Sequence, residues 1–90
     1  MTTFEFIKHA QREVYNWFFA KYSEESKTVA FSPDDVFVVW ECKILQNHKA
    51  ILAAPTPDNY MFEVTYNGDA HVFYFDVYDK IRNYPFYGEN

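Results

Sequence analysis

The sequence has few of the residues from which catalytic and metal sites are built. It contains one cysteine, Cys42, which allows no internal disulfide and no cysteine zinc cluster. Two glycines are too few for a glycine-rich phosphate-binding loop. The three histidines, His9, His48 and His71, have no metal-ligand spacing. The sequence therefore predicts no metal, no cofactor and no enzymatic activity.

Long apolar runs and positive charge are also scarce. No apolar run approaches the ~18 residues of a membrane span, and the N-terminal residues lack a signal-peptide pattern. Eight Lys and Arg residues stand against 13 Asp and Glu residues, which gives a net charge of −5. Proteins that bind duplex nucleic acid need a basic face to displace counterions. We therefore expect a cytoplasmic protein that binds neither a membrane nor duplex nucleic acid.

Aromatic residues, in contrast, are abundant. Ten Phe, eight Tyr and two Trp make up 22% of the 90 residues. Each aromatic side chain removes roughly 150–250 Å² from water when it is buried, and one small core cannot hold twenty of them. Some aromatic side chains should therefore lie at the surface, where a contiguous patch would mark a contact site.

The periodicity predicts one α+β domain over residues 1–90, with an N-terminal helix on a four-stranded antiparallel β-meander and a short C-terminal helical turn. Thr2 and Glu5 have the spacing of a capping box, and the helix should end near Tyr22. Its core stripe is predicted to be Phe4, Ile7, Ala10, Val14, Trp17 and Phe18. Residues 32–35 should form a single helical turn, because a Ser is followed by Pro and two acids.

Four strands should follow. The first is expected over residues 36–45 and the second over 49–54, and the prolines at 55 and 57 fix a connection. Asn67 and Gly68 predict a two-residue type I′ hairpin, which would place Phe62 opposite Phe73 and Tyr60 opposite Phe75. Residues 76–83 change period again and predict the short C-terminal helical turn.

Alternation along the first strand divides it into two faces. Val36, Val38, Trp40, Cys42 and Ile44 are predicted to face the core, so Cys42 should be buried and unreactive. Glu41 and Lys43 fall on the other face, where they could meet Lys49 and Glu63 across adjacent strands. This charged face is either a solvated surface or a polar recognition surface.

Three stretches resemble a known family. They are WECKILQNHKA at 40–50, EVTYNG at 63–68 and YFDVYDKIRN at 74–83. They are similar to small proteins of unknown function encoded by phages and prophages of Gram-positive bacteria. The resemblance implies a phage origin and a small accessory role in the host cell, and it assigns no catalytic residue.

Two aromatic groups are candidates for partner binding, because neither is clearly covered by a predicted face. They are the outer flank of the helix, Tyr15, Phe19 and Tyr22, and the C-terminal tail, Tyr84, Phe86 and Tyr87. Glu41, Lys43 and Glu63 form a third candidate. The tail could instead fold over the helix and complete the core.

Three functions remain open. The first is a non-enzymatic, phage-encoded protein that modulates or inhibits a host protein, such as a defence or replication factor. The second is a structural homo-oligomeric accessory protein. The third is a nucleotide or single-stranded nucleic-acid binding module, which the acids around the aromatic rings disfavour.

Overall fold

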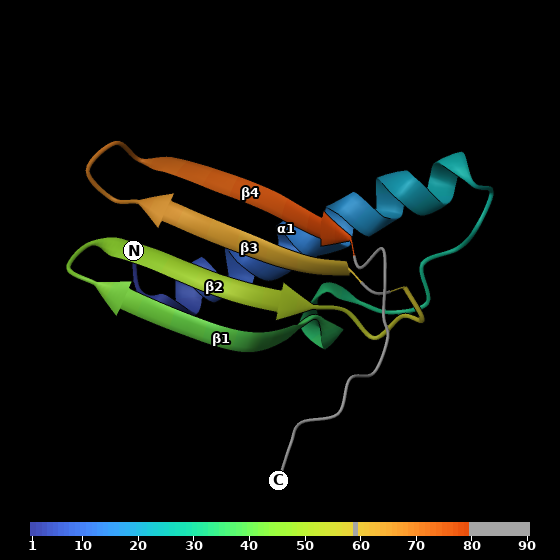
Figure 1. The fold of residues 1–90 in the computed structure, drawn as a ribbon, viewed down its shortest axis with the longest axis horizontal. Helices are drawn as coiled ribbons and strands as arrows, with labels where there is room; N and C mark the ends of the chain where they lie inside the picture. Colours follow the sequence, from blue (N-terminus) through green and yellow to red (C-terminus); the bar gives the residue numbers. More distant parts are fainter. Residues whose placement is uncertain (59, 80–90) are drawn as a thin grey trace, which may run out of the picture.

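The computed structural model describes residues 1–58 and 60–79, which form one helix and one antiparallel sheet (Figure 1). The elements are α1 (Thr3–Glu24), the 3₁₀ turn η1 (Pro33–Asp35), β1 (Phe37–Ile44), β2 (Asn47–Ala53), β3 (Tyr60–Asn67) and β4 (Val72–Asp79). The strands lie in the order β1-β2-β3-β4. The predicted α+β fold, an N-terminal helix on a four-stranded meander, is confirmed.

Helix α1 begins at the predicted capping box. The Thr2 hydroxyl accepts a hydrogen bond from the Glu5 amide at 3.1 Å, and the Glu5 carboxylate accepts from the Thr2 amide at 2.9 Å. These hydrogen bonds, the one from the Thr2 backbone first, lower the pKa of Glu5. The predicted core stripe was wrong at the first turn, because Phe4 is 70% exposed while Phe6 is fully buried.

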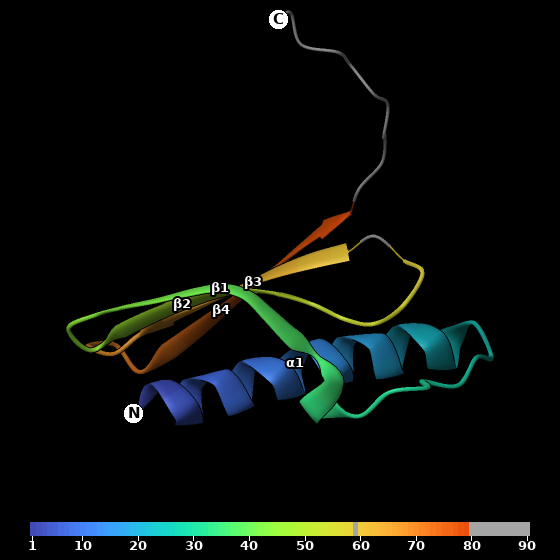
Figure 2. The same cartoon turned by 90° about the horizontal axis from the view of Figure 1, so that it is seen from below.

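The helix covers one face of the sheet and leaves the other face without a second layer among the described residues (Figure 2). Its buried side chains meet those of the two central strands. The core residues of the helix and the sheet are Phe6, Ala10, Val14, Phe18, Tyr22, Val36, Ala50, Leu52, Phe62, Val64 and Tyr66. Aromatic rings in this core meet mostly edge to face, as Phe18 does with Phe31 and with Phe62 at 5.5 Å. Such pairs add to the stabilisation that burial provides.

A β-bulge at Val39 overturns the predicted faces of the first strand. Val38 pairs with Leu52, but Trp40 pairs with Ile51, so Val39 is an extra residue. Because successive side chains alternate between faces, one inserted residue moves every later side chain to the opposite face. Of the predicted core face, only Val36 and Val38 therefore lie on the helix side. Trp40, Cys42 and Ile44 point away from it, contrary to the prediction.

The β3–β4 hairpin has a longer turn than predicted. Phe62 pairs with Val77 and Tyr66 with Phe73, a shift of four residues from the expected register. Gly68 does not have a positive φ, and the left-handed residue is His71 at 55°. The Asn67 side chain accepts hydrogen bonds from the amides of residues 69 and 70 and so stabilises the four-residue turn. Since the shift is an even number, the predicted division of side chains between the two faces is preserved.

The two hairpin tips lie side by side (Figure 1). The Gly68 amide donates to the Asn47 side chain at 2.9 Å, and the Gln46 amide group donates to Asp69. The opposite end of the sheet differs from the prediction, because β4 continues to Asp79 where a helical turn was expected from residue 76. Residues 80–83 of that predicted turn lie outside the described residues.

Candidate binding surface

The face of the sheet that points away from α1 carries large apolar side chains that no described residue covers. We call it the open face, and define it by Phe37, Trp40, Ile44, Met61, Val72, Tyr74 and Tyr78. Their exposed fractions run from 38% at Val72 to 66% at Ile44, and Trp40 is 49% exposed. The side chains come from β1, β3 and β4, and Lys49, Glu63 and Thr65 lie between them on the two central strands. Large apolar side chains exposed together on one face are typical of a contact site.

Two hollows lie on the open face. One, of about 330 Å³, is lined mostly by apolar atoms of Trp40, Cys42 and Ile44 with Lys49 and Thr65 beside them. The other, of about 510 Å³, is lined by Ala53, Ala54, Thr56, Asp58, Tyr60, Met61, Tyr78 and Asp79. The first is large enough to hold an apolar side chain of a partner.

Charge on the open face is sparse. Lys49 and Glu63, on neighbouring strands, form an ion pair at 3.4 Å. Asp76 of β4 lies opposite Glu63 of β3. Within the part of the face that the structure describes, the one lysine is therefore bonded to a carboxylate, and Asp76 adds a second negative charge. The large apolar side chains lie mainly on the two edge strands, the ion pair lies between the two central strands, and the face is mildly acidic.

The bulge also separates the charged residues that were predicted to lie together. Glu41 pairs with Ala50 and Lys43 with His48, so both lie on the helix side of the sheet. Glu63 lies on the open face with Lys49. The predicted set Glu41, Lys43 and Glu63 therefore does not form one surface.

The outer flank of α1 is less exposed than predicted. Tyr22 is buried, and its hydroxyl donates to Asp58 at 2.7 Å. Burial, followed by this hydrogen bond, raises the pKa of Tyr22. Tyr15 is half-buried against Phe31 at 5.9 Å, and Phe19 alone of the three is largely exposed, at 57%. Of the three, only Phe19 offers an open aromatic surface.

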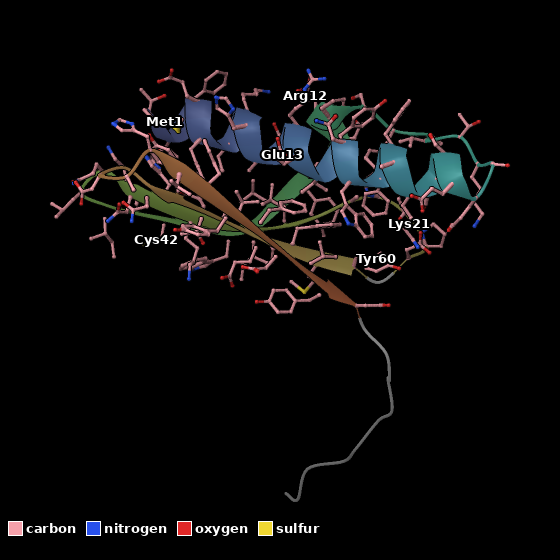
Figure 3. The ribbon with its side chains drawn as sticks, turned by 90° about the horizontal axis from the view of Figure 1, so that it is seen from above. Met1, Arg12, Glu13, Lys21, Cys42 and Tyr60 are labelled. Atoms are coloured by element: carbon pink, nitrogen blue, oxygen red, sulfur yellow. The ribbon has the colours of Figure 1, made fainter. Side chains whose placement is uncertain are left out.

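The C-terminal end of α1 is tied to the loop before β3. Lys21 lies beside Tyr60 (Figure 3), with its ammonium group 5.5 Å from the Tyr60 ring and 5.9 Å from the Trp17 ring. A hydrogen bond with Tyr60, and then the charge of Glu25, raises the pKa of Lys21. These contacts hold the helix end against the sheet and leave the open face as the larger uncovered surface.

Cys42 is not the buried thiol that the sequence predicted. It is half-buried and lies on the side of the sheet away from α1 (Figure 3), where it lines the hollow beside Trp40. The tail residues Tyr84, Phe86 and Tyr87 lie outside the described residues.

The sequence analysis missed most of the open face. In the predicted hairpin register Met61, Val72 and Tyr74 also share a face, but nothing in the sequence indicates that this face lacks a covering element among the described residues. One signal in the sequence did point to it. Large apolar side chains occur on both faces of the same strand, as at Tyr74 and Phe75. A strand that is apolar on both faces needs two layers, and α1 can supply only one.

Among residues 1–58 and 60–79, no group of three or more His, Cys, Asp or Glu side chains is placed to hold a metal ion. No helix in this part of the chain is long and apolar enough to cross a membrane.

Among the described residues, the fold and this surface define a small α+β domain with one sheet face covered by the helix and the other open. A family model matches residues 7–87, and the chain belongs to that family, the family of unknown function DUF6275. No curated protein and no solved structure matches the chain.

Proposed function

We propose that this chain is a non-enzymatic, phage-encoded protein that binds and modulates a host protein, such as a defence or replication factor, in the host cytoplasm. The observation that carries the proposal is the open face, with Trp40 at 49% and Ile44 at 66% exposure beside a hollow of about 330 Å³. Protein interfaces are enriched in aromatic residues, and Trp40, Tyr74 and Tyr78 supply them on this face.

Covering the open face would be favourable. Full burial of a large apolar side chain is worth roughly 1.5–3 kcal/mol, and about half of the Trp40 surface is exposed and could be buried by a partner. Several such side chains on one rigid sheet provide anchors that lose little conformational entropy on binding. The hollow between Trp40 and Ile44 is suited to receive a protruding apolar side chain of the partner.

The charges suggest the surface chemistry of the partner. The open face carries Glu63 and Asp76, and the chain has a net charge of −5. A partner with apolar side chains facing Trp40 and Ile44 and with basic groups facing Glu63 and Asp76 would be complementary, and attraction between the charges would raise the association rate more than the affinity. The resemblance of residues 40–50, 63–68 and 74–83 to phage proteins supports a host protein as the partner.

A nucleic-acid ligand is disfavoured by the same charges. Aromatic rings on a sheet can stack bases, but single-stranded nucleic-acid binders also need cations beside those rings. Lys49 is already paired with Glu63 at 3.4 Å, and Asp76 would repel a phosphate.

A matched pair of substitutions tests the proposal. Immobilised protein is incubated with lysate of a Gram-positive host, and bound proteins are identified by mass spectrometry. Trp40→Ser should lose the partner that the unsubstituted chain captures. Phe4→Ser removes an aromatic ring that is 70% exposed on the helix, and it should keep that partner.

Two outcomes would contradict the proposal. In the first, Trp40→Ser retains the same partner at the same yield, so the open face is not the binding surface. In the second, the unsubstituted chain captures nothing and carries ultraviolet absorbance at 260 nm from nucleic acid, so the ligand belongs to another class.

A further inference from the structure

The two edges of the sheet are built differently. The β1 edge carries the Val39 bulge and the charged residues Glu41 and Lys43, which are features that prevent an edge strand from pairing with another chain. The β4 edge has no bulge, and its charged residues are the two acids Asp76 and Asp79. Its eight residues from Val72 to Asp79 pair with β3 without a register shift, and they include no proline, lysine or arginine. Strand β4 therefore presents a long, regular edge.

Strand β4 is also apolar on both faces. Val72, Tyr74 and Tyr78 lie on the open face, and Phe73, Phe75 and Val77 lie on the helix side. The helix side of β4 is only partly covered, since Phe73 is 37% and Val77 36% exposed. A hollow of about 240 Å³ remains there, lined by His9, Glu13, Val64, Phe73 and Phe75. The edge can therefore gain apolar contacts above and below the plane of the sheet.

We propose that β4 pairs antiparallel with β4 of a second copy of this chain, so that the two sheets become one eight-stranded sheet. The pairing is about a two-fold axis perpendicular to the sheet, so the open faces of both copies lie on the same side. Residues opposite one another must then belong to the same face.

Charge selects the register. Centring the axis on Asp76 would set it directly opposite the partner's Asp76, and like charges directly opposite are destabilising. Centring it on Phe75 sets Phe75 opposite the partner's Phe75 on the helix side. Tyr74 then lies opposite the partner's Asp76, and Phe73 opposite the partner's Val77.

Most of the strand is complementary in this register. Val72 lies opposite the partner's Tyr78, so apolar side chains meet apolar ones except where Tyr74 faces the partner's Asp76, and no acid faces an acid. An unrelated strand would fit equally well only if it had the same order of apolar and acidic residues. A second copy of the chain has that order by symmetry.

The inference does not rest on the proposed host partner. It places the two open faces side by side in one continuous surface, which would double the area available to any ligand. A pair of edge strands buries less than the roughly 800 Å² per partner of a standard interface, so the dimer should be weak and concentration-dependent.

Sedimentation equilibrium tests the pairing. The chain should sediment at about twice 10.8 kDa near 0.1 mM, as expected for a micromolar dimer. Tyr74 is 54% exposed and can be replaced by either charge. Tyr74→Glu places an acid opposite the partner's Asp76, and Tyr74→Lys places a base there. The dimer dissociation constant should be about tenfold higher for Tyr74→Glu than for Tyr74→Lys.

Cysteine cross-linking checks the register independently in a Cys42→Ser background. With the axis at residue 75, the two Cα atoms of Phe75→Cys lie about 5 Å apart, within disulfide range. Those of Tyr74→Cys lie about 8 Å apart, beyond that range. Mild oxidation should therefore join Phe75→Cys and leave Tyr74→Cys monomeric in denaturing gels.

The inference is overturned if the unsubstituted chain sediments as a monomer at this concentration. It is also overturned if the chain is dimeric but the two Tyr74 variants have equal dissociation constants and Phe75→Cys does not cross-link. Copies would then associate through another surface.

Discussion

Phe62→Ala is expected to lower the free energy of unfolding by about 3–5 kcal/mol, the largest effect predicted for a single substitution here. Phe62 is fully buried at the centre of the core. Its ring lies 5.3 Å from that of Trp17, 5.5 Å from that of Phe18 and 5.7 Å from that of Phe75. Truncation would leave a cavity between the helix and the sheet. Because small domains are stable by only about 5–15 kcal/mol, the variant should be close to unfolding at room temperature.

Trp40→Ala is the matched comparison. It removes a larger aromatic ring, but that ring is half exposed on the open face, so the loss should be about 1 kcal/mol or less. Urea titrations of the two variants, followed by far-ultraviolet circular dichroism, measure the difference. If Trp40→Ala is as destabilising as Phe62→Ala, Trp40 belongs to the core and β1 has no bulge at Val39.

Gly68→Ala should cost about 1–3 kcal/mol, although an alanine can adopt the backbone conformation of this residue. A Cβ atom at Gly68 would overlap the carbonyl oxygen of Gln46 and lie 2.6 Å from its Cγ. The two hairpin tips would have to separate, with loss of the hydrogen bond from the Gly68 amide to Asn47.

The control for Gly68→Ala lies in the same turn. His71 has a φ of 55°, a region that glycine enters without strain. His71→Gly should therefore change stability little, because relief of strain offsets the lost contact between His71 and the Tyr66 hydroxyl at 3.2 Å. Denaturation midpoints of the two variants distinguish the four-residue turn from a type I′ turn. In a type I′ turn, Gly68→Ala would be destabilised by its positive φ, and this cost would not depend on contact with Gln46. In a type I′ turn His71 would lie in a strand, and His71→Gly would lower the stability by roughly 0.5–1 kcal/mol.

Local signals predicted the local structure well. The Thr2 and Glu5 capping box, the turn after Ser32 and the existence of four strands all depend on residues close together in the sequence, and all are confirmed. The register of the β3–β4 hairpin was wrong because Asn-Gly was taken as a complete turn. In the structure, Asn67 instead accepts hydrogen bonds across a four-residue loop.

The candidate surface could not be predicted because it depends on two non-local features. The bulge at Val39 arises where β1 pairs with β2, and the alternation of apolar residues continues through it without a sign of change. Alternation also identifies the two faces of a strand without indicating which face another element covers. Trp40 was therefore assigned to the core, although among the described residues it belongs to the uncovered face.

Acrylamide quenching of Trp40 fluorescence tests the central claim, that the open face is exposed and available to a partner. Trp17→Phe removes the other tryptophan and keeps an aromatic ring against Tyr60 and Phe62. The remaining signal should be readily quenched in the folded protein, with an emission between that of a buried tryptophan and that of a tryptophan in water, because about half of the side chain is exposed. A blue-shifted emission that resists quenching in the folded protein would contradict the account, because Trp40 would then be covered and unavailable for binding.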